Sequence, residues 1–179
     1  MRWQFDPAHT IVQASAKHMM FTTVRVSFTG TRGEIEYEPP SPEDAWVTLS
    51  VPAHALSSND DRRDGHLRSA DFLDVANHPE ITFKSTRVVK AGEALYKVTG
   101  DLAIRGTTRP VTVDVLLHGI YDDERTGRRA FLDATVTIDR REWGLVWNMP
   151  VPQGLLVGNE VLIEFSIEAV PFQHEGAAA

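Results

Sequence analysis

The sequence predicts an all-β protein built from antiparallel strands around one hydrophobic core. Three observations support this fold class. Apolar and polar residues alternate in many short segments, which is the pattern of strands that bury one face. Turn-forming residues lie between most of these segments, as in sandwiches and barrels. The chain has 179 residues, of which 42% are hydrophobic, and this size and composition are those of one globular domain.

Each expected strand has one apolar face. The second strand changes the phase of its apolar residues between Gly30 and Gly33, which indicates a bulge or glycine kink. About eight such strands suggest a sandwich or a closed barrel. The expected faces are, strand by strand, Val12, Ala14 and Ala16; Val24, Val26, Phe28, Ile35 and Tyr37; Ala45, Val47, Leu49 and Val51; Ile81 and Phe83; Tyr96, Val98, Leu102 and Ile104; Val111, Val113, Val115 and Leu117; Leu132, Ala134, Val136 and Ile138; and Val161, Ile163, Phe165 and Ile167.

One longer segment breaks the alternation. Residues 57–75 have helical spacing, with Ser57 or Ser58 as the expected N-cap and acidic residues in the first turn. Phe72 belongs to the apolar stripe of this helix, and the Asn-His-Pro corner at residues 77–79 ends it. The helix is expected to lie against the strands.

Two aromatic and methionine-rich segments stand apart from the strands. HMMFTT, at residues 18–23, is short and apolar and is interpreted as one helical turn. EWGLVWNMP places Trp143 and Trp147 around an expected turn. These groups either plug one end of a barrel or, with Phe72, frame an entrance to it.

The interior of such a barrel is either filled by side chains or holds one ligand. Ala14 and Ala134 are small where a packed core requires bulk, and an empty void costs stability. Phe28, Phe83 and Phe165 could project across the interior and fill it. The residues alone therefore leave both interiors open.

Composition and charge exclude several functions. The formal net charge of -7 argues against nucleic acid, because phosphate binding relies on clustered Lys and Arg. The chain has no cysteine, which excludes disulfides, thiolate metal sites and a cysteine nucleophile. No run approaches the ~20 apolar residues of a membrane span, so stable membrane insertion is not expected. Met1 leads directly into RWQFDPAH without signal-peptide features, and we expect a cytoplasmic protein.

The sequence shows no motif for metal binding or catalysis. The seven histidines lack H-x-x-x-H or H-x-H spacing, and the calcium-loop-like DDRRDGHLRSAD has Arg62 where a ligand oxygen is required. No nucleophile elbow or phosphate-binding loop is present. We therefore expect no enzyme, no metal and no resident cofactor. The alternative is an enzyme acting on a small apolar substrate, with His18, His66 or His78 as general base.

Five segments together resemble the YceI-like family of polyisoprenoid-binding proteins. They are DPAHTIVQASAKHM, DGHLRSADFLDVANHPEITFKST, LAIRGTTRPVTV, IDRREWGLVWN and LVGNEVLIEFSIEA, in the order and near the spacing of that family. The resemblance covers Trp3 to Val170 and is most specific between His66 and Phe83. It implies one extended, eight-stranded, antiparallel lipocalin-like β-barrel with short helices covering one side, formed by residues 1–170 and followed by a flexible tail at residues 171–179.

The resemblance also implies a function. The barrel interior would bind a polyisoprenoid or similar long-chain lipid, such as a prenyl pyrophosphate or a quinone, for transport, storage or sensing. A homodimer is implied as well, and many relatives are periplasmic. Family members usually carry a bulky aromatic residue where this chain has Ala14, a departure that would deepen the pocket or shift ligand preference.

Pattern and resemblance together give a set of candidate ligand-binding residues. For a charged head group, the candidate contacts are Lys17, Arg68, Arg105, Arg109 and Arg140. The candidate lining of the pocket is Val12, Ala14, Met19, Met20, Phe21, Phe28, Leu49, Leu67, Phe72, Phe83, Val98, Leu102, Val113, Val115, Leu132, Val136, Trp143, Trp147 and Phe165.

Overall fold

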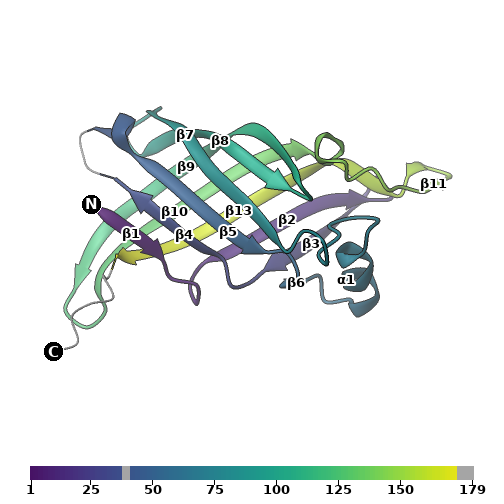
Figure 1. Cartoon of the computed structure of the whole chain (residues 1–179), viewed down its shortest axis with the longest axis horizontal. Coiled ribbons are helices and arrows are strands. Elements are labelled where there is room, and N and C mark those ends of the chain that lie inside the picture. Colours follow the sequence, from purple (N-terminus) through teal and green to yellow (C-terminus); the bar gives the residue numbers. More distant parts are fainter. Residues whose placement is uncertain (38–40, 173–179) are drawn as a thin grey trace.

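A computed structural model describes residues 1–37 and 41–172 and confirms the all-β prediction. Strands make up most of the described chain, and one short α-helix with two 3-10 turns accompanies them (Figure 1). The helical elements are α1 (Asp61–Arg68), η1 (Pro42–Asp44) and η2 (Arg140–Trp143). The strands are β1 (Arg2–Phe5), β2 (Ile11–His18), β3 (Thr22–Phe28), β4 (Arg32–Glu36), β5 (Trp46–Pro52), β6 (Leu56–Ser57), β7 (Glu80–Lys90), β8 (Leu95–Ile104), β9 (Thr107–Asp123), β10 (Gly127–Asp139), β11 (Pro150–Val151), β12 (Gly154–Leu155) and β13 (Val157–Pro171).

The strands close into an antiparallel barrel. Around the ring the order is β1, β4, β5, β7, β8, β9, β10 and β13, and pairing of β1 with β13 completes it. Closure leaves the backbone of the ring paired on both sides, which removes the exposed edges of an open sheet. The predicted eight-stranded antiparallel barrel is thus confirmed, and the sandwich alternative is wrong.

One end of the barrel has a different wall. β13 pairs with β1 along residues 169–171 and with β2 along residues 157–166, so β1 and β2 follow each other on the same edge of β13. β3 pairs with β2 and with the short β6. At this end β2 and β3 therefore continue the wall that β1 and β4 form at the other end.

The expected single strand with a glycine kink is in fact two strands. β3 ends at Phe28 and β4 begins at Arg32, and the two join different neighbours. Gly30 between them has a φ of 72°, a left-handed conformation that glycine adopts without steric cost. The phase shift in the sequence marks this change of partner and not a bulge.

The sequence analysis did not predict β1. Trp3 and Phe5 are only 3% and 4% exposed, and they form a core cluster with Ile167 and Ala169 of β13. The strand has four residues, so it offers only two apolar positions and almost no periodicity to detect.

The helical predictions are correct in place and wrong in extent. α1 begins after Asp60, whose side chain accepts from the backbone N–H of Arg63, and it ends at Arg68. The expected caps Ser57 and Ser58 lie upstream, where Ser58 donates to the buried Asp64. Beyond Ser69 the chain continues in turns, so the helix is much shorter than the predicted residues 57–75.

The HMMFTT segment is a tight turn and not a helical one. Met19 and Met20 have φ angles of 51° and 69°, which is the left-handed pair of a hairpin turn. The turn joins β2 to β3, whose pairing begins with His18 opposite Thr22. Residues 19–21 connect the paired His18 and Thr22, and so short a turn needs no helical periodicity. The apolar character of the segment therefore did not indicate a helix.

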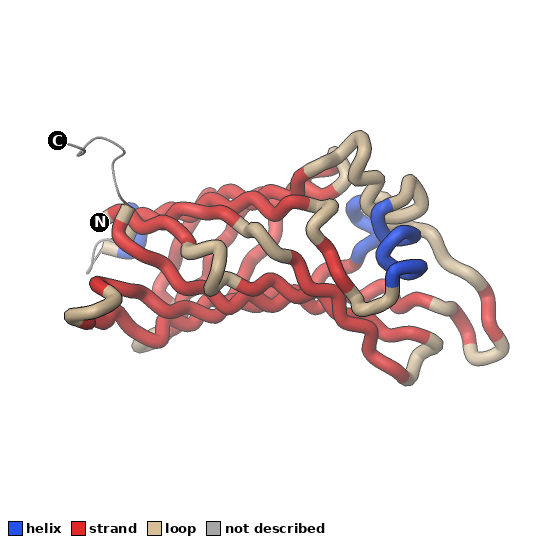
Figure 2. The backbone as a smooth tube through the Cα atoms, turned by 90° about the horizontal axis from the view of Figure 1, so that it is seen from below, coloured by secondary structure: helices blue, strands red, loops and turns tan. Residues whose placement is uncertain are grey.

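The N-terminus and the C-terminal end of β13 lie at the far end of the barrel from α1. Figure 1 shows the N-terminus opposite α1 and β11, and Figure 2 shows α1 and the adjacent loops gathered at one end of the strands. β13 continues to Pro171, and the backbone N–H of Phe172 donates to Arg2. The remainder of the predicted tail, residues 173–179, lies outside the described residues.

Candidate functional site: two adjoining cavities in the barrel

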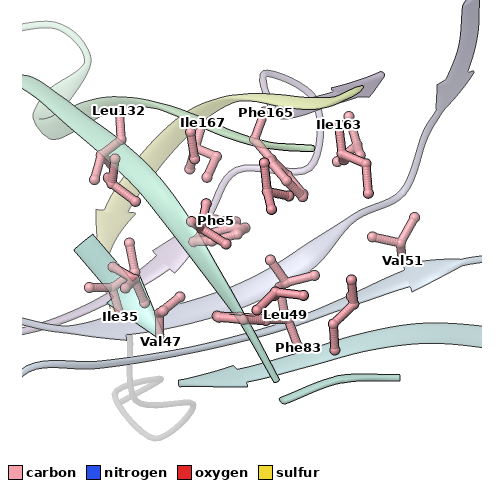
Figure 3. A pocket seen from close by; sticks show the side chains of 18 of the residues that line it. Phe5, Ile35, Val47, Leu49, Val51, Phe83, Leu132, Ile163, Phe165 and Ile167 are labelled. Carbon is pink, nitrogen blue, oxygen red and sulfur yellow. The ribbon is translucent and has the colours of Figure 1, made fainter. Parts of the chain in front are cut away.

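The barrel encloses an apolar cavity, called here the inner cavity. Its volume is about 230 Å³, and its lining runs from Trp3 and Ala169 at one end to Leu145 at the other. Figure 3 shows side chains from opposite walls converging on this space, among them Phe5, Phe83 and Phe165. Within the described chain, Arg140 is the only charged residue in the lining. A small volume spread over so long a lining makes the cavity a narrow channel.

Two glycines let aromatic rings lie flat against the channel wall. A Cβ on Gly100 would approach the ring of Phe83 within 2.5 Å, and one on Gly33 would approach the ring of Phe5 within 2.5 Å. Each ring therefore occupies the space that an inward side chain would take on the neighbouring strand. This packing explains how the barrel holds large aromatics without filling its lumen.

One pair of polar groups lies in the wall of the inner cavity. The hydroxyls of Tyr37 and Tyr96 are 2.9 Å apart, and their rings meet edge to face. Burial, reinforced by the hydrogen bond with Tyr96, raises the pKa of Tyr37 to about 12. The phenol of Tyr37 is therefore neutral at physiological pH.

A second, wider cavity, called here the mouth cavity, opens between α1 and the ends of β2 and β3. Its volume is about 780 Å³. It shares Ala14, Phe28, Leu73, Arg140, Leu145 and Val161 with the inner cavity. The polar residues in its lining are Ser15, Lys17, His18, Asp60, Arg62, Arg63, His66 and Arg140. The two cavities together present a ligand with an apolar channel and a polar entrance.

α1 is fixed at its start by a buried network. Asp64 is 5% exposed and accepts from the backbone N–H and the hydroxyl of Ser58. Arg63 donates to the hydroxyl and the carbonyl of the same serine at 2.7 and 2.9 Å. These bonds use the guanidinium of Arg63.

The guanidinium of Arg62, by contrast, makes no hydrogen bond or ion pair with any described residue. Arg62 is therefore the cation in the mouth that is available to a ligand.

Arg140 holds the loop at the junction of the two cavities. It is 3% exposed and donates to the carbonyls of Leu145, Trp147 and Gly158. Burial lowers the pKa of its guanidinium from the usual value. Backbone carbonyls stabilise its positive charge by accepting hydrogen bonds, and no carboxylate of the described chain bonds to it. A buried cation at this position favours a negatively charged or oxygen-rich ligand group.

An aromatic cluster forms one side of the mouth. The ring of Trp147 lies 4.5 Å from that of His66 and 5.4 Å from that of Phe72, measured between centroids. Asp71 is 2.9 Å from Nε2 of His66 and orients the imidazole. Trp143, in contrast, is 1% exposed and donates its indole N–H to Leu102. It belongs to the core and lines neither cavity.

Every residue of the predicted apolar faces lines one of the two cavities. Ala16, Val24 and Val26 lie in the mouth cavity, and the others line the inner cavity. The candidate ligand residues in the inner cavity are Val12, Ala14, Phe28, Leu49, Phe83, Val98, Leu102, Val113, Val115, Leu132, Val136 and Phe165. Ala14 and Phe28 also border the mouth cavity, together with the candidates Leu67, Phe72 and Trp147.

The remaining candidates lie elsewhere. Met19, Met20, Phe21 and Trp143 line neither cavity, because the first three form the exposed β2–β3 turn and the fourth is packed in the core. Their contact with a ligand stays a prediction that the cavity geometry does not support.

The candidate head-group residues also fall into two groups, one at the cavities and one away from them. Arg140 lines both cavities, whereas Arg68, Arg105 and Arg109 donate to backbone carbonyls outside them. Lys17 borders the mouth, but it alternates with Ala16 and His18 and donates to Thr23 on the outer face. Arg140 is therefore the only member of this set whose side chain the geometry places at the cavities.

Sequence reasoning missed Arg62 and Leu145. Arg62 was weighed only as a defect in a calcium loop, and no periodic signal shows which way a short polar helix faces. Leu145 lies in an irregular loop that Arg140 positions. Trp3 and Phe5 were missed with β1, although their alternation is visible once the strand is known.

The geometry gives little support to the alternative of an enzyme with a histidine general base. His18 and His66 border the mouth, whereas His78 lies beside Asp74 and Gly106, away from both cavities. In the described lining of the mouth, the one hydroxyl belongs to Ser15, which alternates with Ala14 and Ala16 and so points outward. The mouth therefore does not pair a hydroxyl nucleophile with a histidine base.

A separate ionic cluster lies near the opposite end of the barrel. Asp6, His9 and Glu168 bring ligand atoms within 4.8 Å of one another. Arg129 bonds to both carboxylates and supplies the positive charge that a metal ion would bring. The hydrogen bond from His9 lowers the pKa of Asp6, and the same bond raises the pKa of His9. This cluster ties β1 to β10 and β13 and is not part of the cavities.

Membrane-spanning helices were sought in the described residues. No helix there has the length and apolar character needed to cross a bilayer.

Known structures have the same fold. BcnA of Burkholderia cenocepacia superimposes with a TM-score of 0.80 at 22% identity, covering 93% of this chain and 99% of that one. The YCEI protein of Campylobacter jejuni gives 0.74 at 19% identity, covering 88% and 90%. A polyisoprenoid binding domain from Saccharophagus degradans gives 0.71 at 11% identity, covering 95% and 98%. These likenesses extend over the whole barrel.

Sequence relatives lead to the family. A UPF0312 protein of Vibrio cholerae is 32% identical over 138 residues, which are 77% of this chain and 73% of the relative. A UPF0312 protein of Pseudomonas putida is 34% identical over 137 residues, or 76% and 71%. The YceI-like domain matches residues 3–169, which run from Trp3 in β1 to Ala169 in β13 and so cover nearly the whole closed barrel. The chain therefore belongs to the YceI-like family.

Proposed function

We propose that this protein binds a polyisoprenoid or similar long-chain lipid, with the tail in the inner cavity. The observation that carries the proposal is the lining of that cavity, in which Arg140 is the one charged residue among the described ones. The barrel of Saccharophagus degradans, described as a polyisoprenoid binding domain, has the same fold and lends support. A narrow apolar channel fits an extended hydrocarbon chain better than a compact ligand.

Burial of the tail alone supplies enough free energy. Each buried CH₂ contributes about 0.8 kcal/mol, and association costs about 4–15 kcal/mol, so a few five-carbon prenyl units suffice. Such a channel separates tails that differ by one methylene by only about 1–3 kcal/mol. Selectivity between lipids must therefore come from the polar end.

The polar head group of the lipid occupies the mouth cavity in this proposal. Arg62 bonds to none of the described residues, and His18 and His66 border the same space. A guanidinium binds phosphate oxygens in pairs, which favours a prenyl phosphate or pyrophosphate over a quinone. Arg140, at the junction of the cavities, adds positive potential just below the head group.

Native mass spectrometry of the freshly purified protein, followed by organic extraction, tests the proposal. The expected result is a discrete added mass that extracts as a prenyl lipid, or uptake of polyprenyl phosphate offered to the empty protein. A clean mass of the polypeptide and no uptake of any prenyl lipid would contradict the proposal and indicate a barrel that serves a purely structural role.

A further inference from the structure

A cluster of large apolar side chains is exposed at the α1 end of the molecule. The cluster, called here the apolar tip, belongs to the β2–β3 turn and to the loop that carries β11 and β12. Its side chains are 37–75% exposed, with Phe21 at 75% and Val146 at 65%. Its members are Met19, Met20, Phe21, Val146, Met149 and Leu155.

The two parts of the apolar tip are held together. The backbone N–H of Met19 donates to Leu156 at 2.8 Å, and Leu156 in turn donates to Met149 at 2.9 Å. A Cβ on Gly154 would lie 2.9 Å from the sulfur of Met20, so the turn and the loop are in contact. The members of the tip therefore belong to two segments that are bonded to each other and are not scattered over the molecule. Contiguous apolar surface of this kind marks an interaction site.

The tip is also free of charge. From Trp143 to Asn159 the chain contains no Asp, Glu, Lys or Arg, although 24% of its residues are charged. This is the longest uncharged run in the sequence. The β2–β3 turn, residues 19–23, likewise lacks these residues. An uncharged tip can enter an apolar phase without desolvating an ion.

The tip borders the mouth cavity. His18, Trp147 and Leu156 line the mouth, and they are direct chain neighbours of Met19, Val146 and Leu155 in the tip. Figure 1 shows β11 projecting beyond the end of the barrel, and Figure 2 shows α1 at the same end. A ligand that enters the mouth passes beside the tip.

We propose that the apolar tip docks the protein on the surface of a lipid bilayer, so that a lipid passes between the bilayer and the mouth cavity without crossing water. This inference rests on the proposed lipid-binding function. The tip enters the interfacial region reversibly, as exposed methionines and aromatics on loops can, and the strands stay outside it.

The shape and position of the tip favour a bilayer over a second copy of the chain. A stable protein interface buries about 800 Å² on each partner and requires complementary shape, whereas a fluid bilayer accommodates a projecting loop. A second copy seated on the tip would also lie across the route into the mouth. A bilayer at the same place is the phase in which long-chain lipids dissolve.

Single-cysteine labelling tests the docking directly, because the natural chain contains no cysteine. Val146→Cys in the tip and Leu95→Cys, an exposed leucine of β8 outside the tip, are each labelled with a polarity-sensitive fluorophore. Phosphatidylcholine vesicles are then added. We expect a blue shift and a several-fold rise in emission at position 146 and no change at position 95. No response at 146, or an equal response at 95, would overturn the proposal.

Introducing negative charge into the apolar tip gives a second readout. We expect Val146→Asp combined with Leu155→Asp to reduce co-flotation with phosphatidylcholine vesicles at least tenfold, and the matched Leu95→Asp to leave it unchanged. Flotation of the natural protein should be equal at low and high salt, because no ion pair is involved. If the double variant instead separates a dimer, while the natural protein ignores vesicles, the tip is an interface between copies and the proposal is wrong.

The docking and the lipid-binding function can fail separately. Uptake of polyprenyl phosphate from detergent by a protein that ignores vesicles would overturn the docking alone. Flotation of a protein that takes up no prenyl lipid from any source would overturn the lipid-binding function and leave the docking in place. Uptake from detergent by the double Asp variant should equal that of the natural protein, because Val146 and Leu155 line neither cavity.

Discussion

The inner cavity and the mouth cavity share a boundary but differ in construction. The inner cavity is built by alternating residues of paired strands, such as Val113 of β9 and Val136 of β10, whose backbones are bonded on both sides. The mouth is lined by the ends of β2 and β3 together with α1 and an irregular loop, and it contains charged side chains such as Arg62. Since an apolar channel distinguishes hydrocarbon tails only weakly, the proposed function assigns the discrimination between lipids to the mouth.

Filling the inner cavity should have the largest effect. Ala134→Phe places a ring in the channel, and the loss of space for one prenyl unit corresponds to about 4 kcal/mol, or roughly a thousandfold in Kd. Ala134 is 6% exposed, faces the channel from β10 and lies opposite Phe165 of β13. The measurement is a titration with polyprenyl phosphate.

Thr135→Phe is the matched control for this experiment, because it adds the same ring to the outer face of the same strand. Its Kd should equal that of the natural protein. Unchanged affinity in a folded Ala134→Phe variant would show that the tail lies outside the inner cavity.

Removal of the buried cation at the junction should destabilise the fold. Arg140→Met leaves the carbonyls of Leu145, Trp147 and Gly158 without their donors, at about 1–3 kcal/mol for each buried group. We expect the urea midpoint to fall by the equivalent of about 3 kcal/mol or more. The neighbouring Arg141→Met, which removes an exposed pair with Asp139, should change stability by less than about 1 kcal/mol.

Unchanged stability of the Arg140→Met variant would assign a different role to Arg140. If Arg140→Met unfolds at the same urea concentration as the natural protein but loses affinity for lipid phosphate, its main contact is with the ligand and not with the loop. Arg140→Lys should not restore stability, because an ammonium cannot reproduce the planar fork that reaches several carbonyls.

The same contrast explains what could be predicted from the sequence. The strands that build the channel show a period of two, and every apolar residue assigned to a face lines a cavity. The mouth depends on the tertiary position of short segments. Capping of α1 by Asp60, instead of Ser57 or Ser58, and the position of Arg62 beside the mouth depend on where this short helix lies in the fold. Neither leaves a periodic signal.

The β2–β3 turn illustrates a further limit. Apolar residues 19–21 were expected either to plug one end of the barrel or to frame an entrance for the ligand. The left-handed φ of Met19 and Met20 instead puts the three side chains at a hairpin tip. Sequence alone could not separate a buried wall from an exposed docking surface, because both select the same residue types.

Neutralising the free cation of the mouth should have a moderate and selective effect. Arg62→Gln removes a guanidinium that bonds to no described side chain, so the fold should not weaken. Affinity for polyprenyl phosphate should fall about tenfold, which corresponds to about 1.4 kcal/mol, and affinity for the uncharged polyprenol should not change.

The control for this variant is Arg87→Gln, which removes an exposed arginine from β7, away from the mouth. It should bind both lipids as the natural protein does. An equal loss of phosphate and alcohol binding in Arg62→Gln would mean that Arg62 shapes the entrance without contacting the head group.

The smallest effect is expected at the end of the barrel that faces away from the mouth. The bond with Asp6 raises the pKa of His9, so this histidine stabilises the fold at low pH and the contribution is lost as pH rises through the raised pKa. The bond with His9 lowers the pKa of Asp6, whose contribution is lost as pH falls through that lowered value. The pair therefore stabilises the fold most at pH values between the lowered pKa of Asp6 and the raised pKa of His9, in mildly acidic solution.

His9→Gln should lower Tm slightly in mildly acidic solution. It should leave Tm unchanged above neutral pH, where the imidazole is no longer charged. His54→Gln, which alters an exposed ring without a described side-chain hydrogen bond, is the control variant measured over the same pH range. A His9→Gln difference that persists unchanged at alkaline pH would assign the contribution to packing and not to charge.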